Sequence, residues 1–463
     1  NLLNYLAATN TKEGKLMGTE LSKKYGLYTA IAMVVGIVVG SGVFFKAEKI
    51  LTATGGDLPL GILAWVIGGL IMIACAYTFS VMATRYEHVN GIVDYAEAAM
   101  GKKYGYYVGW FMAMIYYPTI TSVLAWVSAR YTAVLFGWDI TGGECMTIAG
   151  FFLVAGYALN ALSPVLAGKF QVTTTVIKLV PLLIMAVAGT VAGLNNGMIV
   201  QNFTTVVTEV NSATALFTAV VAASFAYEGW IIATSINAEL KDSKRNLPIA
   251  LVAGTFTVML VYIMYYVGLA GAVTNQTLMA GGEAGAKLAF ETIFSGIGGT
   301  LLFVFVIISC LGTLNGLMLG CTRGIYSIAA RNQGPNPRLF KQVDNFTNMP
   351  TNSAIFGLLL CAIWLLFFYG ANLGQHWFGF FCFDSSELPI VTIYALYIPI
   401  FIMVMKKEKD LPAFKRYIMP TLAVIGSAFM MIAACFAHRI AVVAYLIVFA
   451  VIMALGALYS KGK

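Results

Sequence analysis

GIVVGSGVFF, at residues 36–45, interrupts an apolar run that extends from about Tyr28 to Leu51 and is long enough to cross a bilayer. Three glycines and one serine weaken a helix near the middle of this run, because glycine loses the most backbone entropy on ordering and leaves the helical hydrogen bonds unshielded. A helix that opens here exposes N–H groups on its outer half and C=O groups on its inner half, which suit a carboxylate and an ammonium. In hydrocarbon such groups persist only where they line a cavity or contact a ligand.

Gly36 and Gly40 also form the pattern G-x-x-x-G, a frequent packing motif between helices. This stretch alone therefore supports a binding site and a packing face equally.

The composition is that of a polytopic helical membrane protein. Of the 463 residues, 60% are hydrophobic and 10% are charged, and the mean hydropathy is +0.83, values that exclude a soluble domain. Apolar runs of spanning length, separated by short polar segments, predict twelve transmembrane helices, at about 26–51, 58–83, 105–136, 144–162, 168–194, 212–238, 247–274, 299–331, 351–369, 377–405, 415–436 and 440–460.

The basic residues are distributed unequally between the two sides of these predicted helices. The termini and the even-numbered gaps carry 22 Lys and Arg residues, whereas the odd-numbered gaps carry 4: Lys46, Lys49, Lys287 and Arg439. By the positive-inside rule both termini are expected in the cytoplasm, with residues 1–25 as a cytoplasmic segment. The net charge of +8 therefore reflects topology and not a nucleic-acid-binding surface. The polar, lysine-bearing start predicts no cleavable signal peptide, so the first span is expected to act as the signal anchor.

Cysteine and histidine form no pattern of metal ligands. The seven cysteines include no C-x-x-C pair, and most of them fall inside predicted spans as small apolar packing residues. The three histidines, His88, His376 and His438, are far apart in the sequence. No metal and no cofactor are predicted, and no Ser/His/Asp or Cys/His set lies at one membrane depth, so an enzyme is not expected.

Lys178 is the most informative single charge. It follows Gly168 by ten residues, which at 1.5 Å per residue places it roughly 15 Å deep, near the centre of the bilayer. A lysine at that depth is costly and is functional by default. Its alternative role, a structural cation that satisfies carbonyls of neighbouring helices, is itself functional if those carbonyls belong to an opened helix.

A second interrupted helix is predicted around Glu228 and Gly229, inside the sequence ASFAYEGW at residues 223–230. Glu228 needs a partner at mid-span, and a structural ion pair with another span and a direct role in substrate binding are equally supported. Interruptions in the first and sixth spans are what a five-plus-five inverted repeat predicts. The repeats would be residues 26–194 and 212–405, which together form the transport core, and residues 406–463 would add the last two helices and a cytoplasmic C-terminus.

Four motifs, in the expected order, resemble the amino acid–polyamine–organocation superfamily. Within it they are most similar to the L-type amino acid transporter branch and to bacterial alanine–serine–cysteine exchangers. The motifs are GIVVGSGVF at 36–44, FAYEGW at 225–230, Glu239 with RNLP at 245–248, and GTLNG at 312–316 with Arg323.

The resemblance implies a substrate site made mostly of backbone. Gly40, Ser41, Gly42 and Val43 would line the substrate site, and the N–H groups of the last three would bind the substrate carboxylate. The carbonyls that would bind the ammonium belong to Ile37, Phe225, Ala226, Tyr227 and Glu228, and Phe225 would also form an outer gate.

Lys178 matches the lysine that this family carries where sodium-coupled relatives bind an ion. It would bridge Gly36 in the first span to Ser309 in the eighth. A fixed positive charge can replace Na⁺ in holding the carbonyls of an opened helix, so no sodium gradient is needed and exchange is the expected mode.

The sequence therefore predicts a stand-alone secondary transporter that exchanges small neutral L-amino acids such as alanine, serine and cysteine across the plasma membrane by alternating access. Eukaryotic members have Gly or Ser in place of Glu228, so the side-chain preference does not transfer from them. Cys145 lies near the loop cysteine that joins their light subunits to a glycoprotein, but at the start of a span, so no obligate heavy-chain partner is expected.

Three alternatives remain at this point. The first is a proton-coupled symporter for amino acids or amines, in which Lys178 or Glu228 titrates. The second is a membrane receptor or enzyme, and the third is a channel, although no repeated filter motif is visible.

Overall fold

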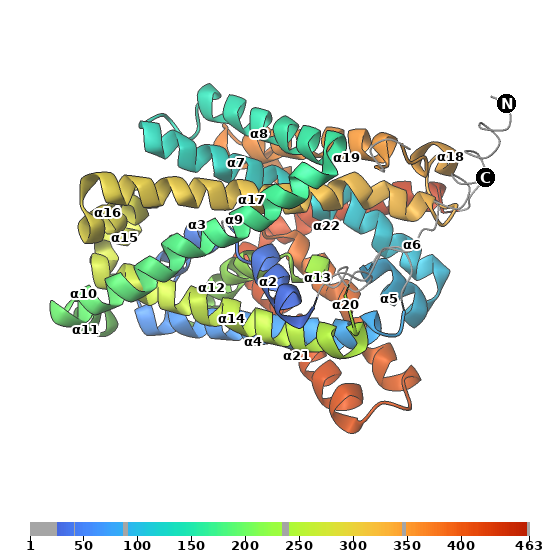
Figure 1. Cartoon of the computed structure of the whole chain (residues 1–463), viewed down its shortest axis with the longest axis horizontal. Coiled ribbons are helices and arrows are strands. Elements are labelled where there is room, and N and C mark those ends of the chain that lie inside the picture. Colours follow the sequence, from blue (N-terminus) through green and yellow to red (C-terminus); the bar gives the residue numbers. More distant parts are fainter. Residues whose placement is uncertain (1–25, 41, 87–90, 234–239, 345–348, 461–463) are drawn as a thin grey trace, which may run out of the picture.

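The computed structural model describes residues 26–40, 42–86, 91–233, 240–344 and 349–460. Every regular element in this part of the chain is a helix (Figure 1). In the first half the helices are α2 (Leu27–Val38), α3 (Gly42–Ala53), α4 (Leu58–Ala83), α5 (Gly91–Met100), α6 (Lys102–Phe111), η1 (Met112–Tyr116), α7 (Tyr117–Phe136), α8 (Gly143–Leu162), α9 (Pro164–Ile184), η2 (Met185–Gly189), α10 (Thr190–Asn195) and α11 (Met198–Thr204). In the second half they are α12 (Ser212–Tyr227), α13 (Trp230–Ala233), α14 (Ser243–Ala272), α15 (Asn275–Gly281), α16 (Glu283–Phe294), α17 (Gly296–Ala329), α18 (Pro337–Phe340), α19 (Thr351–Phe368), η4 (Tyr369–Leu373), η5 (Gly379–Phe381), α20 (Pro389–Lys407), η6 (Phe414–Ile418), α21 (Met419–His438) and α22 (Ile440–Leu458).

Among the described residues, ten continuous helical runs are long and apolar enough to cross a membrane. They correspond to ten of the predicted spans: Leu58–Ala83, Lys102–Phe136, Gly143–Leu162, Lys169–Asn195, Ser243–Ala272, Gly296–Ala329, Thr351–Leu373, Pro389–Lys407, Phe414–His438 and Ile440–Leu458. The residues of the predicted first and sixth spans form shorter helices instead, α2 with α3 and α12 with α13.

The predicted start of the tenth span, at residue 377, is wrong. The helix α20 begins only at Pro389, which occupies its first turn. Before it, the carboxylate of Asp384 accepts bonds from the backbone N–H (2.8 Å) and the hydroxyl (2.5 Å) of Ser386, a local turn that competes with helix formation. The apolar residues between 377 and 388 are therefore a connection and not the first turns of a span.

A π-helical turn, η1, precedes α7 in the third predicted span, and a proline explains it. Pro118 has no N–H to donate to the carbonyl of Met114, four residues earlier. The indole Nε1 of Trp364 on α19 donates to that carbonyl at 2.9 Å instead. The bond satisfies a polar group that would otherwise cost about 1–3 kcal/mol to bury.

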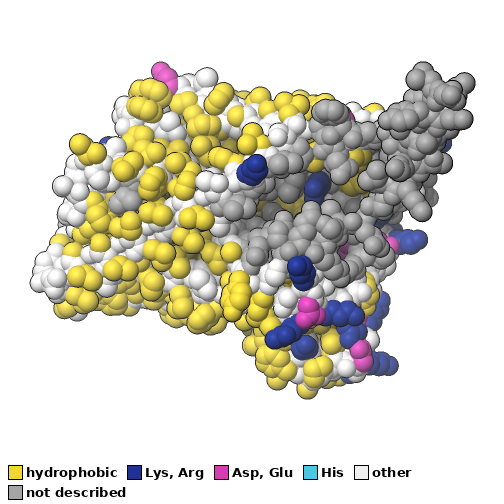
Figure 2. Space-filling view, viewed as in Figure 1, with side chains coloured by type: hydrophobic (Ala, Val, Ile, Leu, Met, Phe, Trp, Pro, Cys, Tyr) yellow, Lys and Arg dark blue, Asp and Glu magenta, His cyan; other side chains and the backbone are white. Residues whose placement is uncertain are grey.

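The packing places the short helices α2, α3 and α12 inside the bundle. The helix α14 packs against α2 and α4, and α12 packs against α3 and α4, whereas α17 packs against α7 and α9. The surface is mostly apolar in the view of Figure 2, and Lys and Arg side chains gather on the lower lobe. Exposed Ile363 (62%), Ile425 (60%) and Leu455 (49%) are typical of an apolar surface that meets lipid.

Candidate functional site

The first interruption lies between α2 and α3. Val39, after the end of α2, has an extended conformation (ψ 110°), and α3 begins at Gly42. A Cβ atom on Gly42 would lie 2.4 Å from Cα of Ala226, so α3 approaches the end of α12 at a distance that only glycine allows. Gly36 and Gly40 are equally close to neighbouring side chains, those of Thr175 on α9 and Thr313 on α17. Glycine therefore provides close packing here as well as an interrupted helix.

The second interruption lies between α12 and α13. The helix α12 ends at Tyr227, with Phe225 and Ala226 buried in its last turn. Glu228 is extended (ψ 156°), and Gly229 has a φ of +103°, a left-handed conformation that residues with side chains rarely adopt. Ser41 in the first interruption and Glu239 after the second lie outside the described residues.

Tyr262 on α14 connects the two interruptions. Its hydroxyl lies 3.1 Å from the carbonyl oxygen of Val38 and 3.0 Å from that of Ala226, so it donates to the last turn of α2 or of α12. Sequence reasoning missed this residue, although Tyr262 is followed at helical spacing by Tyr265 and Tyr266, an aromatic stripe in the middle of an apolar span.

Lys178 on α9 is completely buried, and its Nζ donates to the carbonyl oxygen of Gly36 in α2. This carbonyl is within the last turn of α2, where the helix leaves carbonyls without intrahelical partners. Ser309, the other predicted contact of Lys178, lies on α17. Its buried hydroxyl has no hydrogen-bond partner among the residues that the structure describes.

Glu228 contacts a tyrosine. The hydroxyl of Tyr116, at the end of η1, donates to its carboxylate, and the backbone N–H of Gly229 is a second donor. Within the described part of the chain no cation forms an ion pair with Glu228. Tyr394 and Tyr397 on α20 lie nearby, with ring centroids 5.4 Å apart. The π turn thus aims a tyrosine hydroxyl at the second interruption.

A buried charge cluster lies beside Phe225 and was not predicted. It consists of Lys46 on α3, Glu387 before α20 and His438 at the end of α21, and we call it the Lys46–Glu387–His438 cluster. Lys46 forms an ion pair with Glu387, whose other oxygen is 3.0 Å from Nε2 of His438. The ammonium of Lys46 also lies 4.6 Å from the centroid of the Phe225 ring, a cation–π contact. The cluster joins α3, α12, α20 and α21 around the predicted outer gate.

No group of three or more His, Cys, Asp or Glu side chains suitable for a metal ion occurs among the described residues. The seven cysteines are all free thiols, and Cys145 is buried at the start of α8. The site therefore consists of backbone groups at two interrupted helices, one lysine, one glutamate and several tyrosines.

Comparisons with known proteins identify similar transporters. A family model for amino acid permeases matches residues 25–458. The serine/threonine exchanger SteT of Bacillus subtilis (strain 168) is 30% identical over 419 residues, which cover 89% of this chain and 91% of that protein. The b(0,+)-type amino acid transporter 1 of Mus musculus is 25% identical over 366 residues, covering 77% of this chain and 72% of that protein. Among solved structures, MhsT in complex with L-phenylalanine has a TM-score of 0.61 at 14% identity and covers 93% of this chain and 99% of that chain, a likeness of fold alone.

Proposed function

The chain belongs to the amino acid permease family, and from this membership we propose that it exchanges small neutral L-amino acids, alanine, serine and cysteine among them, across the plasma membrane without sodium. Family membership makes it an amino acid transporter and not an enzyme. The observation that carries the proposal is the pair of interrupted helices, which approach each other at Gly42 and Ala226 and share Tyr262.

The proposed architecture has twelve membrane helices. Ten are the continuous spans, and the first and sixth are α2 with α3 and α12 with α13, each opened near mid-membrane. Residues 26–194 and 212–405 would be the two inverted repeats of the transport core, with α21 and α22 in residues 406–463 appended. The excess of Lys and Arg in the termini and even-numbered gaps supports a cytoplasmic location for residues 1–25 and for the C-terminus.

In the proposed recognition mode, the amino acid lies between the opened helices. The N-terminal end of α3 carries the positive end of a helix dipole, so the N–H groups of Ser41, Gly42 and Val43 would bind the carboxylate. The carbonyls that would bind the ammonium are those of Ile37, Phe225, Ala226, Tyr227 and Glu228. Phe225, held by the contact with Lys46, would cover the site from outside.

Lys178 would take the place of a sodium ion. Its ammonium contacts the carbonyl of Gly36, and Ser309 on α17 supplies a buried hydroxyl as the second proposed contact. A covalently attached charge is present in every step of the cycle, so its binding cannot drive net accumulation. Exchange follows if the carrier without substrate reorients slowly. The relative SteT, a serine/threonine exchanger, supports this mode. No heavy-chain partner is part of the proposal.

The test uses purified protein in liposomes. Uptake of labelled L-alanine and L-serine is measured with and without internal amino acid, in sodium-free buffer, with the pH gradient absent or imposed. We expect uptake that requires internal amino acid and is unchanged by the pH gradient. Net efflux faster than exchange contradicts the proposal.

A second candidate, proton-coupled symport, is supported by one contact. A buried tyrosine hydroxyl on the Glu228 carboxylate is an arrangement through which a proton can move. In the same liposomes, uptake into vesicles without internal substrate that follows the imposed proton gradient establishes symport instead of exchange.

A further inference from the structure

A cavity of about 610 Å³ opens at the end of the bundle where α4 ends and α14 begins. Three basic side chains from three different segments converge on it: Arg85 after α4, Lys244 in the first turn of α14, and Lys415 in η6. Its remaining lining residues are Val81, Thr84, Tyr86, Pro248, Asp410 and Leu411. The cavity thus has a basic rim, one acidic residue and several apolar side chains.

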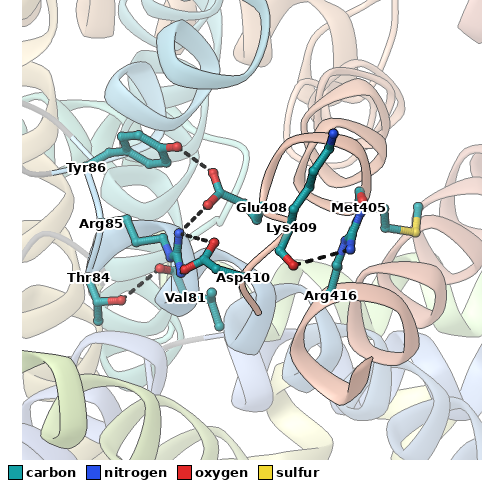
Figure 3. Close-up of polar contacts among 9 residues, drawn as sticks. All are labelled: Val81, Thr84, Arg85, Tyr86, Met405, Glu408, Lys409, Asp410 and Arg416. Carbon is teal, nitrogen blue, oxygen red and sulfur yellow. Dashed lines mark hydrogen bonds and ion pairs between the residues drawn. The ribbon is translucent and has the colours of Figure 1, made fainter. Parts of the chain in front are cut away.

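The acidic residue, Asp410, forms an ion pair with Arg85, which also pairs with Glu408. The guanidinium bonds to both oxygens of Asp410 and lies 2.5 Å from one oxygen of Glu408, whose other oxygen accepts from the hydroxyl of Tyr86 (Figure 3). These hydrogen bonds from Arg85 hold the pKa of the Asp410 carboxyl below its ordinary value, so the pair stays ionised at neutral pH. Asp410 therefore anchors Arg85 at the rim. Because Arg85 offsets only one of the two carboxylates, the positive charge of the cavity comes from Lys244 and Lys415, which outweigh the remaining negative charge.

The two lysines leave the cavity positively charged. Neither Lys244 nor Lys415 forms an ion pair with any residue in the described part of the chain. Lys244 is exposed and Lys415 half-buried, and both line the cavity. Two ammonium groups around one hollow, neither ion-paired with a described residue, favour a ligand with more than one acceptor oxygen, such as a phosphate.

The cavity adjoins the apolar surface of the bundle. In η6, Phe414 is 50% exposed and Tyr417 46%, directly beside Lys415, and Ile249 on α14 is 41% exposed beside Pro248. Figure 2 draws this lobe with dark blue basic and yellow apolar side chains next to each other. A ligand with an anionic head and hydrocarbon chains would contact both surfaces at once. Basic pockets between membrane helices bind lipid head groups in this way.

We propose that the cavity binds the phosphate-bearing head group of an anionic phospholipid, with Lys244 and Lys415 on the phosphate and the acyl chains along η6 and α14. A bound lipid would hold together the end of α4, the start of α14 and η6.

The experiment uses the full-length protein in neutral detergent micelles. The protein is titrated separately with phosphatidylglycerol, with phosphatidylcholine that has the same acyl chains, and with inorganic phosphate. The midpoint of thermal unfolding is recorded in each titration, and native mass spectrometry identifies any lipid that stays bound. We expect a saturable rise of the midpoint with phosphatidylglycerol alone. In the double variant Lys244→Gln/Lys415→Gln the apparent affinity should fall roughly 10- to 30-fold.

The matched control is Lys241→Gln/Lys406→Gln, which removes two exposed lysines from the same end of the bundle but outside the cavity. It should keep the wild-type affinity within about twofold. Equal losses in both double variants would mean attraction to the general basic surface and overturn the site. An equal response to phosphatidylcholine, or no response to any lipid, overturns it too, and a shift with inorganic phosphate alone would assign the cavity to a free anion.

Discussion

Glu228 is partly exposed although Tyr227 and Gly229 on either side of it are buried. Its carboxylate has two donors in the structure, the Tyr116 hydroxyl and the Gly229 N–H, whereas an ionised carboxylate has about four acceptor positions. The remaining capacity suits a hydroxyl on the substrate side chain. We expect Glu228→Ala to lower the preference for L-serine over L-alanine by roughly tenfold, measured as the ratio of their half-inhibitory concentrations in exchange assays.

Glu228→Gln is the matched control, because it keeps the size and one acceptor oxygen and should lose less of the serine preference. Tyr116→Phe removes a donor and leaves the carboxylate, so serine should still be preferred. Equal losses of alanine and serine transport in Glu228→Ala would place the carboxylate outside the side-chain pocket while leaving the exchange proposal intact.

Lys178 gives a second prediction for a single residue. Removal of its ammonium leaves the Gly36 carbonyl without its donor inside the bundle. Loss of a charged hydrogen bond of this kind is worth about 1.5–3 kcal/mol, so we expect the exchange rate of Lys178→Ala to fall roughly 10- to 100-fold. The substrate affinity of the detergent-solubilised variant, measured by thermal shift, separates failed binding from failed reorientation. Wild-type exchange in this variant contradicts the role proposed for the lysine.

Between elements, Tyr262 is the residue that connects the interruptions. Its one hydroxyl proton can serve the Val38 carbonyl or the Ala226 carbonyl, but not both at once. Tyr262→Phe keeps the ring and its stacking on Tyr227 (centroids 5.3 Å apart) and removes only the hydroxyl. We expect a loss of about 1–3 kcal/mol in the free energy of unfolding and unequal KM values on the two sides of the membrane. Tyr265→Phe, one helical turn away on α14, is the control and should change neither.

The Lys46–Glu387–His438 cluster holds α3, α20 and α21 together on the side of Phe225. Truncating one member of a buried ion pair leaves the other charge uncompensated, at a cost of about 3–5 kcal/mol. We therefore expect Lys46→Met to destabilise the proposed outer gate at Phe225 and to raise the external KM more than the internal KM. The reversed pair Lys46→Glu/Glu387→Lys should recover part of the loss. Equal changes of KM on both sides would indicate a structural pair without a gating role.

The Arg85–Asp410 contact at the opposite end makes a prediction about pH. Because the folded protein holds the pKa of Asp410 below its ordinary value, the stabilisation is fully present above the unfolded pKa and is lost as pH falls through the folded pKa. Between pH 5 and pH 8 the difference in unfolding midpoint between the wild type and Asp410→Asn should stay constant, and it should shrink only in stronger acid. A difference that disappears near pH 6 assigns the effect to another group.

At the scale of the whole molecule, apolar length was sufficient to predict where ten of the helices run, because a span must be about 20 apolar residues. Recognition of the family from four short motifs is confirmed by the permease model and by the relatives. The predicted start of the tenth span was wrong because residues 377–383 are mostly apolar but form only the short 3-10 helix η5, and hydropathy does not distinguish such a connection from the start of a span.

The contacts between distant parts of the chain were beyond prediction. Lys46 and Glu387 are separated by 341 positions, and Lys46 was interpreted only as an external topology charge. Tyr262 looked like one more aromatic residue in an apolar span. The role of each residue depends on which side chain it contacts across the bundle. That contact is set by the packing of α3, α12, α14 and α20, and the periodicity of hydrophobic residues in the sequence does not reveal it.

The π turn at Met112–Tyr116 has a consequence for how such proteins diverge. A π turn behaves as a helix with one residue inserted. An α-helix turns by about 100° per residue, so removal of that residue would leave both flanking segments helical and rotate Tyr116 away from Glu228. A single codon deletion in this turn, without any substitution among the residues proposed to contact the amino acid, would therefore change which side chain meets the second interruption. Insertions and deletions, and not point changes alone, are a route by which the specificity of a transporter of this kind can evolve.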